Sequence, residues 1–179
     1  MKSIEQFCSA HRACQEGRDW ALANCKDMQE AWSMAKPDWL IWVATRPGVL
    51  TDRELRLFAV HCARSVQHLL TDTRSIRAID VAERYANGEA TKEELAATRA
   101  AAWDAARGAA RGAARDAAWA AASAAAWAAV RDAVKDAAWA AARTAAWAAD
   151  CDTAWAAALA AAEAGQADWL RNNTQPNFS

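Results

Sequence analysis

Three arginines spaced four residues apart, Arg107, Arg111 and Arg115, form the pattern in this sequence that most suggests binding chemistry. On a helix, like charges at this spacing destabilise the structure by about 0.2–0.5 kcal/mol per pair, so an anionic group is expected opposite them. Gly108 and Gly112 lack a side chain and would let a flat ligand approach the helix backbone. The pattern therefore predicts a site for an anion.

Two tryptophans, Trp103 and Trp119, bracket the arginines and offer ring faces on which a ligand can stack. Together with the three arginines they make up the predicted ligand-binding site. The alternative is structural. In that case acidic side chains from the first half of the chain, such as Glu83, Glu89 or Glu94, neutralise the arginines at a contact between helices.

Two further tryptophans, Trp39 and Trp42, lie in the segment PDWLIWVATR and are the kind of ring that anchors a protein partner. They are the predicted partner-binding residues. The alternative is that this segment packs into the core, with one of the two rings left at the surface.

Histidines near cysteines raise the question of a metal site. Zinc takes ligands from at least two elements and is usually marked by paired Cys or His motifs, none of which occurs here. A free cysteine on an apolar stripe is normally a core residue. We therefore expect no metal and no other cofactor. The residues concerned are Cys8, His11 and Cys14, and His61, Cys62 and His68.

Catalytic motifs are equally sparse. The sequence contains no HExxH, no GxSxG, no glycine-rich phosphate loop and no acidic pair in an apolar setting. We expect a protein that is not an enzyme.

The elements that must position these residues belong to a chain of 179 residues, long enough for one domain with its own core. We expect a single all-α domain over 1–172, with mixed short helices over 1–90, Ala/Trp-rich helices over 91–172 and a polar tail over 173–179. The formal net charge of -1 argues against attraction of the whole molecule to nucleic acid or anionic membrane. Five scattered cysteines, with no signal peptide or spanning segment, favour the cytoplasm.

Start and stop signals divide the first half into helices. The predicted helices are Ser3 past Cys14 toward Cys25, Met28 to Ala35, Pro37 to Arg46, a long helix opened by the capping box Thr51 to Glu54, and a helix from Thr73 or Ser75 to Asn87-Gly88. In the long helix, apolar residues at steps of three and four form one stripe that faces a core: Leu55, Phe58, Cys62, Val66 and Leu69. A second capping box, Thr91 to Glu94, opens the repeat half.

From residue 103 to 163, every fourth residue stands out against an alanine background. Alanine has the highest helix propensity, so this half is expected to be helical. A step of four overshoots one helical turn by about 40°, so the marked side chains spiral around the axis and the tryptophans fill gaps on several sides.

An unbroken helix over 91–172 would be roughly 120 Å long, far more than a compact chain of this length allows. We therefore expect three helices in the repeat half. The predicted breaks are at Gly108, at Gly112, and at residues 150–153, where three candidate N-cap residues cluster.

Several segments resemble immunity proteins of the immunity-five-like family. The likeness covers roughly residues 53–172 and rests on LRLFAVHCARSVQHLL, SIRAIDVAERYANGEATKEELAATRAAAWDAA, the alanine tetrads and the closing EAGQADWLRNN. Residues 14–50 resemble leaders of tryptophan-rich relatives from phage and gut-bacterial sequence collections. The resemblance implies an all-helical fold and a role in conflict between bacteria, or between bacteria and phage. It supplies no catalytic or binding residues.

These observations predict a non-enzymatic binding protein of the immunity or anti-defence type, which sequesters a bacterial or phage protein, a toxin or defence component, stoichiometrically. One alternative is a sponge for a small anionic ligand such as a nucleotide, held by the three arginines and stacked on Trp103 or Trp119. Another is an oligomerisation module without a ligand. Nucleic-acid binding ranks below these because the basic run is short.

Overall fold

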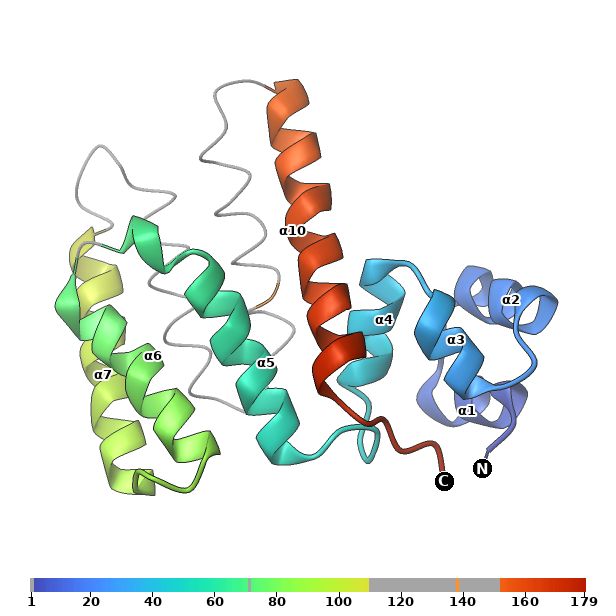
Figure 1. The fold of residues 1–179 in the computed structure, drawn as a ribbon, viewed down its shortest axis with the longest axis horizontal. Coiled ribbons are helices and arrows are strands. Elements are labelled where there is room, and N and C mark those ends of the chain that lie inside the picture. Colours follow the sequence, from blue (N-terminus) through green and yellow to red (C-terminus); the bar gives the residue numbers. More distant parts are fainter. Residues whose placement is uncertain (1, 71, 110–137, 139–151) are drawn as a thin grey trace. The chain divides into compact units, whose positions relative to one another are not determined.

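The computed structural model describes residues 2–70, 72–109, 138 and 152–179, and within these residues every regular element is a helix (Figure 1). The predicted all-α class is confirmed. Most of the tetrad repeat lies outside the described residues, so the number of its helices stays a prediction. The chain divides into two compact units, unit 1 formed by Met1–Thr51 with Ala167–Ser179, and unit 2 formed by Asp52–Gln166.

Unit 1 is built from short helices and the end of a long one. Its elements are α1 (Ile4–His11), α2 (Gln15–Asn24), α3 (Met28–Met34), α4 (Pro37–Ala44) and the last residues of α10 (Asp152–Asn173). The helices predicted at Met28 and at Pro37 are confirmed to within two residues at each end. Figure 1 shows the segments at the two ends of the chain lying together in this unit, where the Lys2 N–H donates to the Phe178 carbonyl at 2.8 Å.

The helix predicted from Ser3 toward Cys25 is in fact two helices. Ser3 caps α1 through a full capping box, as the sequence indicates. The helix ends because Arg12 adopts the left-handed conformation, with φ 54°. Cys14 then caps α2 by accepting a hydrogen bond on Sγ from the Gly17 N–H at 3.4 Å. The sequence gives little warning of this break because left-handed arginine is uncommon and cysteine is not among the preferred N-cap residues.

Aromatic rings from both ends of the chain meet in the core of unit 1. Phe178 lies 5.8 Å from Phe7 and 6.2 Å from Trp32, centroid to centroid, in edge-on arrangements. Leu40 of α4 is fully buried in this unit as well. The segment after α10, predicted as a polar tail, thus carries a buried aromatic ring, because the chain turns back and the Asn177 N–H donates to the Val49 carbonyl at 2.8 Å.

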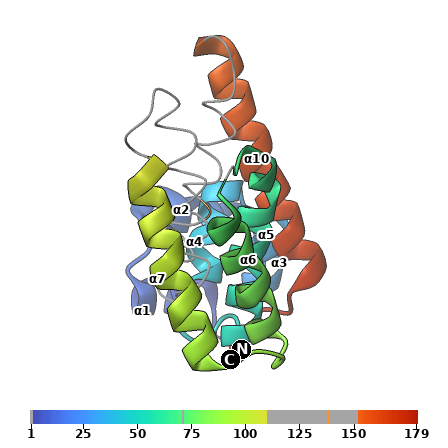
Figure 2. The ribbon, with the colours of Figure 1, turned by 90° about the vertical axis from the view of Figure 1, so that its left-hand side faces the viewer.

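The described residues of unit 2 include three helices that pack in sequence order. They are α5 (Asp52–Ser65), followed by the 3₁₀ turn η1 (Gln67–Leu69), α6 (Thr73–Ala86) and α7 (Lys92–Ala109). Figures 1 and 2 show α6 lying between α5 and α7. The first part of α10 also belongs to this unit.

The apolar stripe predicted for α5 faces the core. Leu55, Phe58, Cys62 and Val66 are all buried, with Phe58 fully inaccessible to solvent. The helix is shorter than predicted, since it ends at Ser65 and the chain tightens into η1 after Val66. The side chain of Leu69, the last predicted member of the stripe, lies outside the described set.

The boundaries of α6 test two further predictions. Asp72, rather than Thr73 or Ser75, caps α6, and its carboxylate accepts from the Arg74 N–H at 2.9 Å. Asp is as strong an N-cap as Ser, so the local signals alone do not decide between them. The stop at Asn87-Gly88 is confirmed, with Gly88 in the left-handed region at φ 79°.

The second capping box is confirmed as well. The Thr91 hydroxyl accepts from the Glu94 N–H at 3.1 Å, and the Glu94 carboxylate accepts from the Thr91 N–H at 2.8 Å. The predicted break at Gly108 is wrong, because α7 continues through it to Ala109. One glycine costs a helix only about 1 kcal/mol, which the surrounding alanines offset. The predicted break at Gly112 lies outside the described residues, while α10 starts at Asp152, inside the third predicted break.

Candidate functional site

Of the predicted ligand-binding residues, the structure describes the side chain of Trp103. This ring is half-buried on α7 and packs against Ala78 of α6 and Ala102. For Arg107 the structure describes the backbone, which is helical, but not the side chain. The remaining predicted members, Arg111, Arg115 and Trp119, lie outside the described residues.

A hollow of about 370 Å³ lies on α7 beside Trp103, which we call the α7 hollow. Arg99 stands one helical turn before Trp103 and forms no ion pair with any described residue. Sequence reasoning missed Arg99 because it counted the tetrad pattern from residue 103, although Arg99, Trp103 and Arg107 continue the same step of four. The described lining of the hollow consists of Ala96, Arg99, Ala100, Trp103 and Asp104.

Two of the acidic residues offered as neutralising partners for the arginines have other partners in the structure. Glu83 on α6 accepts a hydrogen bond from the guanidinium of Arg64 on α5. Glu94 completes the Thr91 capping box and lies 3.7 Å from the Arg84 guanidinium. These contacts connect neighbouring helices of unit 2.

Trp39, the first predicted partner-binding residue, is half-buried on α4 and paired with Trp20 of α2. The ring centroids are 5.3 Å apart and the planes are inclined by 52°. The Lys36 ammonium lies 4.1 Å from the Trp39 ring centroid, a cation–π contact. It also lies 3.4 Å from the Asp38 carboxylate and 3.8 Å from that of Glu16. We call this group of side chains the Trp20–Trp39 patch.

Trp42, the second predicted partner-binding residue, is also half-buried, but it is held on two sides. Its ring meets Phe7 edge-on at 6.4 Å between centroids. The Arg46 guanidinium lies 4.8 Å from the ring centroid, and Arg46 Nε donates to the Trp42 carbonyl at 3.0 Å. Trp42 is therefore held between Phe7 and Arg46, whereas Trp39 pairs with Trp20 and has a rim of charged side chains.

The cysteine and histidine groups weighed for metal binding do not converge in the described part of the chain. There, no three His, Cys, Asp or Glu side chains gather around a common point. Burial raises the pKa of the Cys62 thiol and lowers the pKa of His61, which favours the neutral form of both side chains. Cys8 is likewise buried, and burial raises the pKa of its thiol.

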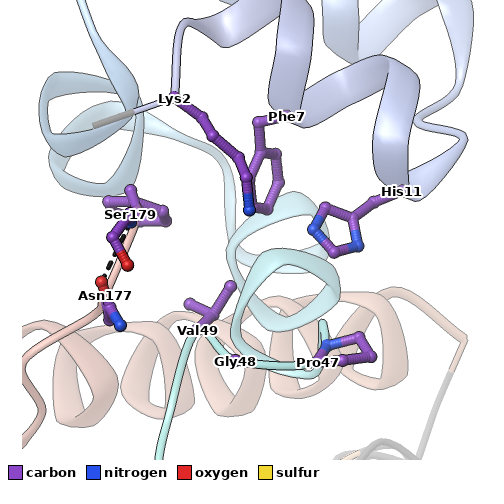
Figure 3. A pocket seen from close by; sticks show the side chains of 9 residues that line it. Lys2, Phe7, His11, Pro47, Gly48, Val49, Asn177 and Ser179 are labelled. Atoms are coloured by element: carbon purple, nitrogen blue, oxygen red, sulfur yellow. Dashed lines mark hydrogen bonds between the residues drawn. The ribbon is translucent and has the colours of Figure 1, made fainter.

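A second cavity, of about 120 Å³, lies in unit 1, and sequence reasoning missed it entirely (Figure 3). Its basic side chains are Lys2, which precedes α1, and His11, the last residue of α1. Burial, then the positive charges of Lys2 and Arg46, lower the pKa of His11. No local motif announces the cavity, because its lining comes from three separated segments: Lys2, Phe7 and His11; Pro47, Gly48 and Val49; Asn177, Phe178 and Ser179.

Comparison of the chain with protein-family models, curated protein sequences and solved structures found no match. Among the described helices, none combines the length and apolar character needed to cross a bilayer.

Proposed function

We propose that this protein is a non-enzymatic binding protein of the immunity or anti-defence type, which neutralises a toxin or defence component by stoichiometric sequestration. The observation that supports binding is the Trp20–Trp39 patch, a half-buried aromatic pair with a charged rim. Partner-binding surfaces typically combine a central aromatic anchor with a polar periphery. The conflict role is supported by the resemblance to immunity proteins.

Covering the Trp39 ring in an interface would contribute a measurable free energy of binding. A fully buried tryptophan removes about 150–250 Å² from water. About a third of Trp39 at most is exposed, so covering it would remove at most about 50–80 Å². At about 25 cal/mol per Å², that area is worth at most about 1–2 kcal/mol, a measurable contribution for one interface residue. The contacts from Trp20 and Lys36 hold the ring in place before binding, which reduces the entropy lost on association.

The experiment is a protection assay in bacteria that carry a panel of toxin genes and phage-defence systems, with and without the protein. A protected pair is then purified and its stoichiometry measured by calorimetry. We expect saturation at a fixed molar ratio and no chemical change in the partner. Catalytic loss of the partner at sub-stoichiometric protein would contradict the proposal.

The patch is tested in the same assay with Trp39→Ala. We expect at least a tenfold loss of affinity, about 1.4 kcal/mol or more, with an unchanged helical circular dichroism signal. Met34→Ala is the matched control, because Met34 is also a large exposed side chain of unit 1, with 53% of its surface accessible. Equal loss in the two variants would remove the patch from the proposal.

A sponge for a small anionic ligand is the second candidate, and the α7 hollow favours it. Arg99 and the half-buried Trp103 place a cation and a ring face at the start of the predicted arginine stripe. Native mass spectrometry of gently purified protein would show an added mass of a few hundred daltons that is lost on denaturation. Replacing Arg107, Arg111 and Arg115 with Gln should abolish that mass while the helical signal remains. If the variant retains the ligand, the arginine stripe is not the binding site. The mass of the protein without ligand also gives its oligomeric state.

A further inference from the structure

The sequence contains one Asn-Gly pair, Asn87-Gly88, and the structure places it at the exposed end of α6. An asparagine carries latent chemistry, because the backbone nitrogen of the following residue can attack the carbon of the side-chain amide. Glycine favours this attack, since its lack of a side chain leaves its nitrogen open to close approach. The other asparagines of the chain are each followed by a residue with a side chain: Asn24, Asn172, Asn173 and Asn177.

The fold holds the two reacting groups of this pair apart. Asn87 has φ -89° and ψ 0°, which turns the Gly88 nitrogen toward the Asn87 nitrogen and away from the side chain. The Gly88 N–H donates to the Tyr85 carbonyl at 3.1 Å. The Arg53 guanidinium of α5 donates to the Asn87 Oδ1 at 2.9 Å. Attack therefore requires rotation about the Cα–C bond of Asn87 and loss of the Gly88 hydrogen bond, so the closed turn is unreactive.

A further pair of hydrogen bonds closes the same turn at the end of α6. The Glu89 N–H donates to the Arg84 carbonyl at 2.8 Å, and the Arg84 guanidinium donates back to the Glu89 carbonyl at 3.2 Å. Asn87, Gly88 and Glu89 are all exposed, so water reaches this turn. Exposed helix ends open locally at a small cost in free energy compared with unfolding of the whole domain. Local opening thus supplies the reactive conformation in a minor population.

We infer that Asn87 is a site of spontaneous, irreversible modification, and that its deamidation occurs only when the closing turn of α6 opens. The Gly88 nitrogen loses its proton and bonds to the Asn87 Cγ, while the Cγ–Nδ2 bond breaks and Nδ2 takes up a proton and leaves as ammonia. Water then opens the resulting succinimide ring. Cleavage of the ring bond to Cγ leaves aspartate, and cleavage of the ring bond to the main-chain carbonyl carbon leaves isoaspartate. The site belongs to unit 2 and does not rest on the proposed function.

The two products differ in their effect on the end of α6. Aspartate places a carboxylate against the Arg53 guanidinium and leaves the main chain unchanged. Isoaspartate inserts one methylene group into the main chain before Gly88. The hydrogen bonds from the Gly88 and Glu89 N–H groups to the last turn of α6 then lose their register. We therefore expect isoaspartate, but not aspartate, to loosen the connection that leads to the capping box of α7.

The test is to incubate the full chain at neutral pH and to quantify aspartate and isoaspartate at residue 87 over time by peptide mass spectrometry. Two reference samples are the chain unfolded in guanidinium chloride and the peptide acetyl-Arg-Tyr-Ala-Asn-Gly-Glu-Ala-amide, which has the sequence of residues 84–90. We expect deamidation of the folded chain at Asn87 and at no other asparagine over the same period. Its rate should be on the order of tenfold or more below the rates of both references, because the closed turn must open first.

Arg53→Gln is the test variant, because it removes the donor that holds the Asn87 side chain. We expect deamidation about fivefold faster than in the wild type when the chain is folded, with an unchanged helical circular dichroism signal, and an equal rate when it is unfolded. Arg77→Gln is the matched control, since it replaces an exposed arginine elsewhere on α6, and it should react at the wild-type rate. Hydrogen exchange of the Gly88 N–H should be faster in Arg53→Gln and in the isoaspartate product, but not in Arg77→Gln.

The inference is overturned if Asn87 stays intact in the folded chain while the peptide reacts, because the turn then never reaches the reactive conformation. Equal rates in the folded chain and the peptide would overturn it as well, since the fold would then not control the reaction. A rate in Arg53→Gln at or below that of the wild type would show that the Arg53 contact does not hold the amide away from the Gly88 nitrogen.

Discussion

At the scale of single residues, two glycines should respond in opposite ways to alanine. Gly88 ends α6 with φ 79°, where a Cβ is strained, whereas Gly165 lies inside α10 with open space around the position of a Cβ. We expect Gly88→Ala to lower the free energy of unfolding by about 1 kcal/mol and Gly165→Ala to raise it by about 0.5–1 kcal/mol. Urea denaturation measures both, and changes of the same sign would contradict the assigned conformations.

Two histidines should make the protein less stable in mild acid. Burial lowers the pKa of His61, and burial with the charges of Lys2 and Arg46 lowers the pKa of His11, both from an ordinary value of 6.5. As the pH falls below 6.5, the unfolded chain takes up protons before the folded one, so stability is lost. We expect a lower free energy of unfolding at about pH 5.5 than at about pH 7.5.

The loss between these two pH values should shrink in His61→Gln and in His11→Gln. His68→Gln, in the exposed turn η1, is the control. An undiminished pH dependence in both test variants would show that other groups cause it.

At the scale of elements, two threonines of the α7 segment allow the effect of an N-cap on stability to be compared with that of a residue inside the helix. Thr91 caps the helix through its hydroxyl, whereas the Thr98 hydroxyl only donates back to the Glu94 carbonyl at 2.8 Å within the helix. We expect Thr91→Ala to cost about 1 kcal/mol, and Thr98→Ala to be neutral or slightly stabilising because alanine is the better helix former. Thermal unfolding of the two variants measures the difference, and equal effects would argue against the cap.

The sequence predicts the presence of a helix correctly wherever strong local signals agree. The α5 stripe from Leu55 to Val66 and the capping box at Thr91 predict helices that the structure confirms, since periodicity and capping act locally. The break at Arg12 was missed because a left-handed conformation is uncommon for arginine and the sequence carries no local signal for it. The break predicted at Gly108 fails for the converse reason, because the alanine background outweighs one glycine.

The same distinction between local signals and contacts made only in the folded chain applies to the candidate sites. Trp39 was found because a tryptophan is conspicuous in any sequence, and its pairing with Trp20 needed only adjacent helices. The unit 1 cavity could not be found, because Lys2, Val49 and Phe178 are brought together only by the completed fold. Arg99 had a usable signal, its place one step before Trp103 in the same spacing.

At the scale of the whole molecule, one ring near the end of the sequence should stabilise unit 1. Phe178 is 5% exposed and meets both Phe7 and Trp32. We expect Phe178→Ala to lower the free energy of unfolding by about 3–5 kcal/mol, with faster hydrogen exchange in α1. Asn173→Ala, an exposed change at the end of α10, should stay within about 0.5 kcal/mol. Unchanged exchange in α1 after loss of the Phe178 ring would contradict this packing.

The contacts within unit 1 also determine when this unit can fold during synthesis. The Arg171 guanidinium donates to the Ala35 carbonyl at 2.6 Å across a separation of 136 residues, and Lys2 is joined to Phe178 across an even longer stretch. A ribosome adds about 5–20 residues per second. The helices α1 to α4 are therefore synthesised many seconds before the C-terminal segment that completes their core. Contacts between residues so far apart in sequence form slowly. Until they form, α1 to α4 expose apolar surface that the finished core covers. Unit 1 can therefore complete its core only after the last residues of the sequence have been synthesised.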